Sequence, residues 1–179
     1  MSDELHFRRA QPNDAEAIAA LVNSGYRGEP SRAGWTTEAD YLVGRRTDAA
    51  EVINLIGGPD SLILLGERDG ELVGPELVCS AHLQRDRDGV QLSMLVVKPA
   101  WQARGIGKRL LLAAEHCART TWGSLVLHMN VITLREELIA YYTRRGYRRT
   151  DIFKPFPIED TRSTALVDDL RFEMLTKQL

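Results

Sequence analysis

Residues 102–107, read QARGIG, have the composition of an anion-binding loop. They follow an apolar, strand-like run that ends at Pro99, and they open an amphipathic helical pattern. Glycines at a strand-to-helix junction let the backbone approach a ligand closely, and the first turn of the helix leaves its N–H groups free to donate. Because the helix dipole adds partial positive charge, these donors suit a phosphate or pyrophosphate, and Arg104 and Lys108 add cationic side chains.

Three known glycine motifs can be compared with this stretch. The phosphate loop of nucleotide triphosphatases requires Ser or Thr after Gly-Lys, but here Arg109 follows. The dinucleotide fingerprint requires a third glycine where Leu110 stands. The pattern instead resembles the acyl-CoA-binding motif of the GNAT superfamily, (Gln/Arg)-x-x-Gly-x-(Gly/Ala), after a strand that ends in Val-x-Pro, here residues 97–99. A glycine turn with nothing bound is the remaining alternative.

The resemblance implies acetyl-CoA as cosubstrate and no metal. In the family, the backbone of the strand equivalent to residues 90–97 hydrogen-bonds the pantetheine arm, and one of its amides polarises the thioester carbonyl. The residues expected to contact acetyl-CoA are Leu95, Val96, Val97, Gln102, Ala103, Arg104, Gly105, Ile106, Gly107 and Lys108.

A second resemblance lies at residues 142–147 (YTRRGY), where GNAT members carry Tyr-x-x-x-Gly-(Phe/Tyr). The family's tyrosine, here Tyr142, often protonates the leaving CoA thiolate. A phenol with a reference pKa of about 10 is protonated at neutral pH and can donate that proton. Packing against the turn that holds Leu138 is the alternative. Arg135 and Leu138 replace the family's asparagine and alanine, so Arg135 would either reach a CoA phosphate or be solvated.

The general base is left open by the sequence. Some family members carry a glutamate at the position of Gln91, which cannot accept a proton, and Ser93 on the same strand face cannot serve alone. Glu76 and His82 share one face of the neighbouring strand, so either could act through a water molecule. A structural role is the alternative for both.

The resemblance places the acceptor between the first helix, the loop after it and the terminal strands. The side chains expected there are Tyr26, Trp35, Glu38, Asp40, Phe153, Phe156 and Asp160. Aromatic and acidic side chains together favour a cationic amine. A solvated loop with one buried tryptophan is the alternative.

Size and composition indicate a single domain, residues 1–179, with 44% apolar residues. A net charge of −2 gives no basic field for nucleic acid. The chain has no apolar run near the roughly 20 residues of a membrane span, and its first residues lack a signal-peptide pattern. Cys79 and Cys117 have no histidine at metal-ligand spacing, so free thiols and a cytoplasmic location are expected.

The hydrophobic patterns and the resemblance together predict an α/β (α+β) fold of the GNAT type, with a mixed, mostly antiparallel twisted sheet of about six or seven strands flanked by helices. Strands are expected at residues 5–9, 62–67, 71–83, 90–97, 125–129, 147–150 and 170–177. Turns at Asp69-Gly70 and Asp88-Gly89 would form a meander. The central strands 4 and 5, residues 90–97 and 125–129, would be parallel because a helix connects them.

Helices are expected over residues 12–22, 48–56, 105–117 and 133–146. Thr47-Asp48 is expected to cap the second, and a capping box of Thr133 and Glu136 is expected to start the last. Residues 25–35 are expected to form a loop.

These features predict an N-acetyltransferase that moves acetyl from acetyl-CoA to a primary amine of a small molecule or peptide. Direct attack in a ternary complex is expected, because neither cysteine has a base partner that would support an acyl-enzyme. The alternative is a module that binds or senses acyl-CoA without turnover. A nucleotide-binding regulatory domain would need a phosphate specificity that the motif lacks. Nucleic acid and membranes are not expected as partners, and a homodimer is left open.

Overall fold

The computed structural model describes residues 4–69, 74–157 and 162–179. Within them, the main sheet has seven strands in the order β1 (Leu5–Arg9), β3 (Ser61–Arg68), β4 (Glu76–Asp86), β5 (Gly89–Val97), β6 (Val126–Ile132), β9 (Arg171–Gln178) and β7 (Arg148–Pro155). A small second sheet pairs β2 (Leu42–Gly44) with β8 (Ser163–Ala165). The helices are α1 (Ala15–Tyr26), α2 (Gly28–Arg32), α3 (Ala49–Gly57), α4 (Ile106–Trp122) and α5 (Glu136–Thr143), with single 3-10 turns η1 (Pro12–Asp14) and η2 (Pro99–Trp101).

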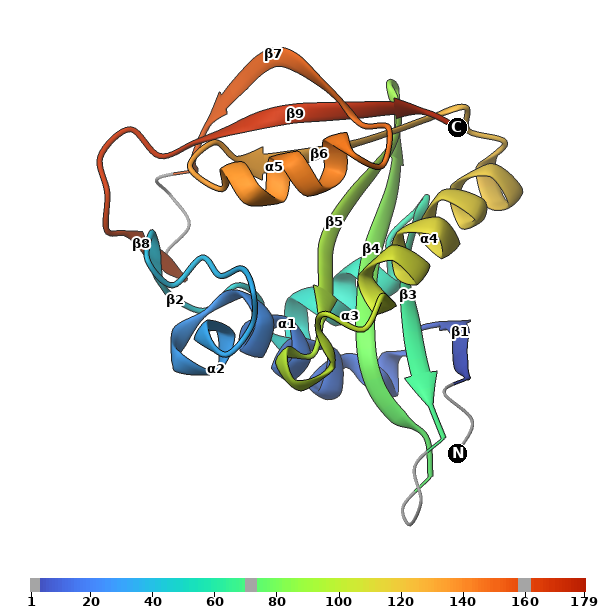
Figure 1. Cartoon of the computed structure of the whole chain (residues 1–179). Coiled ribbons are helices and arrows are strands. Elements are labelled where there is room, and N and C mark those ends of the chain that lie inside the picture. The colour runs from blue at the N-terminus through green and yellow to red at the C-terminus, as the bar shows by residue number, and fades with distance from the viewer. Residues whose placement is uncertain (1–3, 70–73, 158–161) are drawn as a thin grey trace.

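The sheet is strongly twisted, as predicted. Figure 1 shows β6, β9 and β7 running across the direction of β3, β4 and β5. Alternation of side chains along each strand supplies a core to both faces. On β3, Leu62 and Leu64 join the cluster that contains Leu110 of α4, whereas Ile63 and Leu65 join the cluster that contains Ile18 of α1. Helices α4 and α5 therefore cover one face of the sheet, and α1 and α3 cover the other.

A bulge interrupts β5 halfway along its length. Ser80 of β4 pairs with Val96 and His82 pairs with Ser93, so two residue steps on β4 oppose three on β5. Met94 has a positive φ of 46°, a conformation that L-residues rarely adopt and that marks the extra residue. One extra residue reverses which face the following side chains take. As a result Met94 packs on the α1 side of the sheet, whereas the earlier part of β5 packs on the α4 side.

The parallel pair of central strands is confirmed, and it is short. Strands β5 and β6 pair only at Val90–Leu127 and Gln91–His128 within the described residues. Beyond Gln91 the two strands separate, which is visible in Figure 1 where β5 turns down and β6 continues across the top. The edge of β5 from residue 92 to 97 therefore faces an opening between the two halves of the sheet.

Several predictions about local structure are wrong. The expected loop at residues 25–35 contains the end of α1 and a further short helix, α2. The small sheet of β2 and β8 was not predicted. The capping box at Thr133 does not form, because the Thr133 amide still donates to the Arg171 carbonyl at the end of the sheet (3.0 Å). Helix α5 starts three residues later, after Arg135. The predicted Asp48 cap of α3 is correct, since its side chain accepts from the Glu51 amide (2.9 Å).

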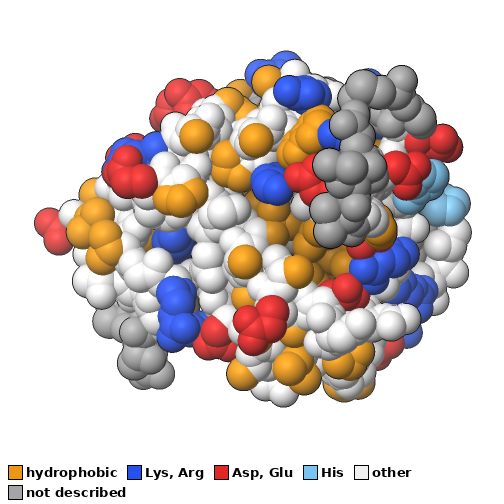
Figure 2. Space-filling model, turned by 90° about the horizontal axis from the view of Figure 1, so that it is seen from below, with side chains coloured by type: hydrophobic (Ala, Val, Ile, Leu, Met, Phe, Trp, Pro, Cys, Tyr) orange, Lys and Arg blue, Asp and Glu red, His pale blue; other side chains and the backbone are white. Residues whose placement is uncertain are grey.

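The outer surface carries mixed charge on the face shown in Figure 2, where basic and acidic side chains are interspersed with apolar ones. No helix among the described residues is both long enough and apolar enough to cross a membrane. Gly70, in the first predicted turn, lies outside the described residues, and β4 begins at Glu76 rather than at residue 71.

Candidate active site

The glycine-loop cavity lies beside the C-terminal end of β5, and its volume is about 350 Å³. Its walls come from α1 and the chain after it, from β5, from the start of α4, and from α5. The lining residues are Gly25, Tyr26, Trp35, Thr36, Leu95, Val96, Val97, Gln102, Ala103, Gly105, Gly107, Lys108, Arg135, Leu138, Tyr141, Tyr142, Arg144 and Arg145. Most residues predicted from the sequence to contact acetyl-CoA are therefore brought together.

The loop before α4 is held in an unusual backbone conformation. Ala103 and Gly105 have positive φ angles of 60° and 77°, and Gly105 is the residue that precedes the first turn of α4. No side chain caps this helix, so the N–H groups of its first turn remain free of a side-chain partner. At Gly107, a Cβ atom would lie 3.1 Å from the Tyr141 hydroxyl, so the glycine keeps this wall of the cavity open. This geometry suits an anion held by backbone donors.

Two of the residues expected to contact acetyl-CoA, Arg104 and Ile106, do not line the glycine-loop cavity. The Arg104 guanidinium stacks on the Trp101 ring, with its central carbon 4.6 Å from the ring centroid. Ile106 is buried in the core on the face of the sheet that α4 covers. The prediction that the Arg104 side chain adds positive charge to the glycine-loop cavity is wrong, because cation–π stacking holds it on the outer side.

Lys108, Arg144 and Arg145 supply the positive charge that Arg104 does not. All three line the cavity, and the Arg145 guanidinium lies 3.4 Å from the centroid of the Tyr141 ring. From the sequence alone, Arg144 and Arg145 are expected only to favour the negative end of a helix dipole. Arg144 and Arg145 follow α5 and share the cavity lining with the first turn of α4, a placement that the motif does not predict.

Gln102 has a structural task in this loop. Its side-chain amide donates to the Val97 carbonyl (3.0 Å) and its oxygen accepts from the Trp35 amide (3.0 Å). The side chain thus fastens the glycine loop to the end of β5 and to the segment after α2. The contact with Trp35 joins segments that are 67 residues apart in the sequence.

A second space, which we call the arginine cavity, lies on the other side of Tyr142 and has a volume of about 340 Å³. Five residues line both cavities: Tyr26, Leu95, Arg135, Leu138 and Tyr142. The arginine cavity is further lined by Arg27, Glu38, Arg46, Gln91, Leu92, Ser93, Met94, Met129, Asn130, Val131, Ile132, Phe156, Pro157, Arg162 and Phe172. Tyr142 therefore stands at the junction of two chambers, and the bulged part of β5 passes beside both.

Tyr142 is held firmly and keeps its proton. Its ring makes edge-to-face contacts with Tyr141 (centroids 5.4 Å apart) and Tyr147 (5.7 Å). Burial raises the pKa of Tyr142 above its ordinary value, so the phenol is protonated at any physiological pH. The neighbouring Tyr26 hydroxyl donates to the Leu95 carbonyl (2.9 Å), which fixes the bulged strand from the α1 side.

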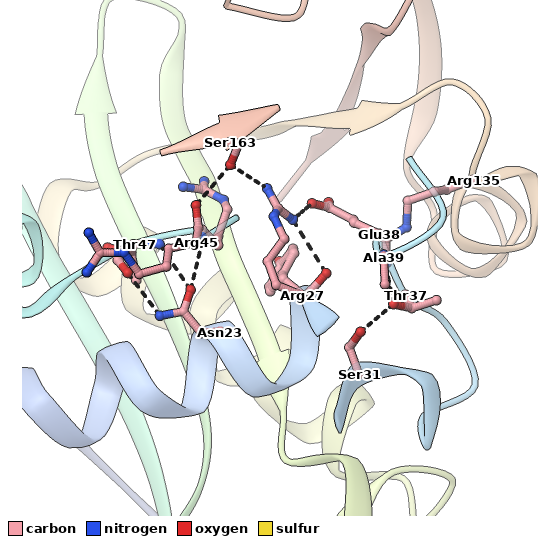
Figure 3. Close-up of polar contacts among 12 residues, drawn as sticks. Asn23, Arg27, Ser31, Thr37, Glu38, Ala39, Arg45, Thr47, Arg135 and Ser163 are labelled. Atoms are coloured by element: carbon pink, nitrogen blue, oxygen red, sulfur yellow. Dashed lines mark hydrogen bonds and ion pairs between the residues drawn. The ribbon is translucent and has the colours of Figure 1, made fainter. Parts of the chain in front are cut away.

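A buried ion-pair cluster forms the wall between the chambers. The Glu38 carboxylate pairs with Arg27 and with Arg135 (2.8 Å), and all three residues are at least 92% buried. Figure 3 shows Arg27 reaching from the end of α1 toward Glu38 on one side and Ser163 on the other, with Arg135 approaching from the α5 side. Arg135 also donates to the Thr36 hydroxyl (2.9 Å). Arg135, expected to be solvated or to reach a phosphate, is thus a buried partner of Glu38.

Replacing Glu38 by glutamine is expected to destabilise the protein. Two buried arginines would lose their counter-charge, and breaking a buried pair typically costs about 3–5 kcal/mol. In a chain of this length that corresponds to a fall in Tm of roughly 6–20 °C. Thermal unfolding measures the change. Asp40→Asn, which breaks an exposed pair with Arg32, is the matched control and should leave Tm nearly unchanged. Equal Tm values for the two variants would contradict the structural role of the cluster.

The structure does not support Glu76 as a base. Its carboxylate binds the Lys98 ammonium (2.7 Å) and the Trp101 indole (3.2 Å), and it lines neither cavity. The hydrogen bond from Lys98 lowers the pKa of Glu76 further, so it is a poor proton acceptor.

His82 lies one step behind the arginine cavity. Its ring nitrogens contact the hydroxyls of Ser61 (2.9 Å) and Ser93 (2.8 Å), and only Ser93 lines the cavity. Burial, and then the charge of Arg46, lower the pKa of His82 to about 4. A neutral imidazole of such low basicity cannot take a proton from an alkylammonium ion effectively. Gln91 does line the cavity, as expected from its strand position.

The residues expected around the acceptor divide into three groups. Tyr26, Glu38 and Phe156 line the arginine cavity, and Trp35 lines the other cavity. Asp40 pairs with Arg32 at the surface and Phe153 is 44% exposed, so neither lines a cavity. Asp160 lies outside the described residues. In those residues, no group of His, Cys, Asp and Glu side chains could hold a metal ion, and both cysteines are free thiols.

Comparison with known families identifies the fold and its chemistry. The model of the acetyltransferase (GNAT) domain matches residues 59–149, which is half of the chain and contains β5, the glycine loop and Tyr142. This chain belongs to the GNAT acetyltransferase family. It therefore has the acetyl-CoA-dependent acetyltransferase fold that the motif at residues 102–107 indicated.

Solved structures of GNAT proteins superpose over nearly the whole chain. A putative acetyltransferase from Salmonella typhimurium, solved with its cofactor acetyl-CoA, is 19% identical with a TM-score of 0.67, covering 99% of this chain and 95% of that one. An N-acetyltransferase from Thermoplasma acidophilum, solved with coenzyme A, is 18% identical with a TM-score of 0.64, covering 98% and 99%.

The ribosomal-protein-S18-alanine N-acetyltransferase of Escherichia coli is 16% identical with a TM-score of 0.66, covering 98% and 94%. Identities this low establish a shared fold and leave the acceptor undetermined. Comparison with curated protein sequences gives no significant match.

Proposed function

We propose that this GNAT acetyltransferase is an N-acetyltransferase that passes acetyl from acetyl-CoA to a primary amine by direct attack in a ternary complex. The observation that carries the proposal is the position of Tyr142, which lines two cavities at once. One cavity has the glycine loop and basic side chains that suit the phosphates of CoA. The other has no glycine-loop residue in its lining and has room for a small acceptor.

Each part of the site has a distinct task in this reaction. The glycine loop and Lys108 hold the phosphates, and the free edge of β5 at residues 95–97 aligns the pantetheine arm by backbone hydrogen bonds. A backbone N–H of the bulged strand stabilises the carbonyl oxygen as negative charge develops on it. The amine nitrogen bonds to the carbonyl carbon as the C–S bond breaks, and the Tyr142 hydroxyl gives its proton to the sulfur. Solvent takes the proton of the amine and returns a proton to the Tyr142 phenolate.

A turnover assay tests the proposal directly. Acetyl-CoA is incubated with a panel of alkylamines, polyamines, antibiotics, amino acids and peptides, free thiol release is followed, and the N-acetyl product is identified by mass. A reaction without amine measures hydrolysis and serves as the control. If calorimetry shows acetyl-CoA binding but no amine releases thiol above that control, the chain is the acyl-CoA-binding or sensing module that is the rival candidate.

The absence of an effective base should appear in the pH dependence of the reaction. His82, with a pKa of about 4, is neutral throughout the range from pH 6 to 10 and contributes no rising limb there. An alkylamine of pKa about 10.4 is neutral in only about one molecule in a thousand at pH 7.4. We therefore expect kcat/KM for such an amine to rise about tenfold per pH unit until the amine itself titrates. A pH profile measured from 6 to 10 checks this.

Gln91→Glu provides the matching variant. A carboxylate at this position in the arginine cavity would supply the missing base, so the rising limb should move to lower pH. A wild-type profile that is already flat above pH 6.5 with a high-pKa amine would show that the protein has a competent base. A cytoplasmic location, a small-molecule or peptide acceptor and a homodimer stay predictions.

A further inference from the structure

The arginine cavity has an unusual charge for an acceptor site expected to take a cationic amine. Among the residues that the structure describes, four guanidinium groups line it, those of Arg27, Arg46, Arg135 and Arg162, against one carboxylate, Glu38. The outer surface has no such excess, since the chain as a whole carries a net charge of −2. The positive charge is concentrated at the place where the acceptor must bind.

Three of the four arginines pair with carboxylates of the protein, although Arg27 and Arg135 share one of them. Glu38 pairs with Arg27 and Arg135, and Glu51 pairs with Arg162. Arg46 differs: among the described residues, its guanidinium has no hydrogen-bond or ion-pair partner, although it is partly buried. Its backbone is fixed, because the Arg46 amide donates to the Asn23 side chain of α1 (2.7 Å). The cavity thus holds one anchored cation without a counter-charge.

The Arg46 charge influences the pKa values of two residues near the arginine cavity, His82 and Tyr26. Burial, and then the Arg46 charge, lower the pKa of His82, which contacts Ser93 on the cavity wall. Burial raises the pKa of Tyr26, and the Arg46 charge opposes part of that rise. Arg46 lines the same cavity as Ser93 and Met94 of the bulged part of β5. An anion bound to it would place the rest of a small molecule between Arg46 and Tyr142.

The remaining lining limits the size and character of that molecule. Met129, Phe156 and Phe172 contribute apolar surface, and the volume of about 340 Å³ suits a compound of amino-acid size. The Asn130 side-chain oxygen is buried without a hydrogen-bond partner in the described residues, and it lines the same cavity, so a donor such as an amine would satisfy it.

We infer that the acceptor is a small amine that also carries a carboxylate, and that Arg46 binds this carboxylate and turns the amine toward Tyr142. This rests on the proposed acetyl transfer and names its substrate class. The arrangement also helps the chemistry. A cavity lined by Arg27, Arg46, Arg135 and Arg162 against Glu38, with Tyr26 and Tyr142 protonated, disfavours a bound ammonium and favours the neutral, reactive amine. The earlier expectation of a cationic acceptor is thereby replaced.

The test compares acids with their carboxamides. Phenylalanine, leucine and methionine are each paired with the corresponding amino-acid amide, and kcat/KM for acetyl transfer is measured with wild type, Arg46→Gln and Arg45→Gln. Arg46→Gln should lower kcat/KM for the acids by about 10- to 100-fold, the range for losing hydrogen bonds to a charged group, with little effect on the amides. Because both enzymes act on the same amines, differences in amine pKa cancel in the comparison.

Arg45→Gln is the matched control, since Arg45 carries the same charge next in the chain but is exposed and does not line the cavity. It should leave the ratio of acid to amide unchanged. An equal loss for acids and amides in Arg46→Gln, or a preference of wild type for polyamines over every amino acid, would overturn the inference.

A binding measurement keeps this test separate from the proposed function. N-acetylphenylalanine and its carboxamide are added to the three proteins and thermal unfolding is followed, since a ligand of the native state raises Tm. If no amine is acetylated but the acid stabilises wild type and not Arg46→Gln, the proposed transfer fails and the carboxylate site stands. If the acid stabilises Arg46→Gln as well as wild type, the carboxylate site is wrong whatever the turnover shows.

Discussion

Tyr142→Phe is expected to lower kcat by about 10²- to 10⁴-fold while the affinity for acetyl-CoA changes little. The ring that remains can keep its contacts with Tyr141 and Tyr147, so the walls of both cavities stay in place. In the described residues the Tyr142 hydroxyl has no hydrogen-bond partner, so its removal leaves no protein group unsatisfied. What is lost is the proton for the thiolate that leaves.

Separate measurements of turnover and binding distinguish this role from packing. Steady-state kinetics gives kcat, and calorimetry with CoA gives the affinity. Tyr147→Phe is the control, because it removes another buried hydroxyl, one that donates to Glu115 (3.1 Å) and lines neither cavity. It should affect stability and not turnover. Turnover of Tyr142→Phe within a factor of about two of wild type would show that water protonates the thiolate and that Tyr142 only packs.

Features encoded by neighbouring residues were predictable from the sequence. The glycine loop, the amphipathic face of α4 and the Asp48 cap each depend on residues a few positions apart, and all three are present. Tyr142 could also be placed, because its motif is local and ends at Gly146, which has a positive φ of 91°. The parallel pairing of β5 and β6 followed from the helix that connects them.

Features that depend on long-range partners were not predictable. Arg135 and Glu38 are 97 residues apart, and nothing local to Arg135 distinguishes a buried ion pair from a solvated side chain. The same holds for Glu76. From the sequence its carboxylate could be a general base, but in the structure it accepts a hydrogen bond from Lys98. No glycine marks the bulge at Met94, yet the bulge determines which side chains of β5 lie on each face of the sheet.

The charge of the arginine cavity depends on such long-range partners. Counting acidic and aromatic residues near the site in sequence favoured a cationic amine, because Glu38 and Asp40 were visible and their partners were not. In the structure Glu38 is neutralised by two arginines and Asp40 is at the surface. Among the described residues, Arg46, which no sequence motif marks, is the lining arginine without a carboxylate partner. The net charge of the arginine cavity thus depends on which ion pairs form, and these pairs are known only from the fold.

Gly107→Glu is expected to abolish CoA binding while leaving the protein folded. Gly107 is the second residue of α4, and its missing side chain leaves the wall of the glycine-loop cavity open beside Tyr141. A carboxylate in the first turn of a helix is favourable to the helix dipole, and glycine is a poor helix former, so the fold should be unharmed or slightly stabilised. Toward a bound pyrophosphate the same carboxylate is repulsive: two unit charges about 4 Å apart repel by about 4 kcal/mol at an effective dielectric constant near 20.

That repulsion corresponds to roughly a 10³-fold loss of CoA affinity, which calorimetry would detect. Two neutral variants separate charge from bulk. Gly107→Gln has the size of glutamate without its charge and should lose much less affinity. Gly107→Ala should bind nearly as well as wild type, because its methyl group would be tight only against the movable end of the Tyr141 side chain and would make an ordinary contact with Val97. If Gly107→Glu is folded, as judged by its Tm, and binds CoA as tightly as wild type, the phosphates do not lie at the start of α4.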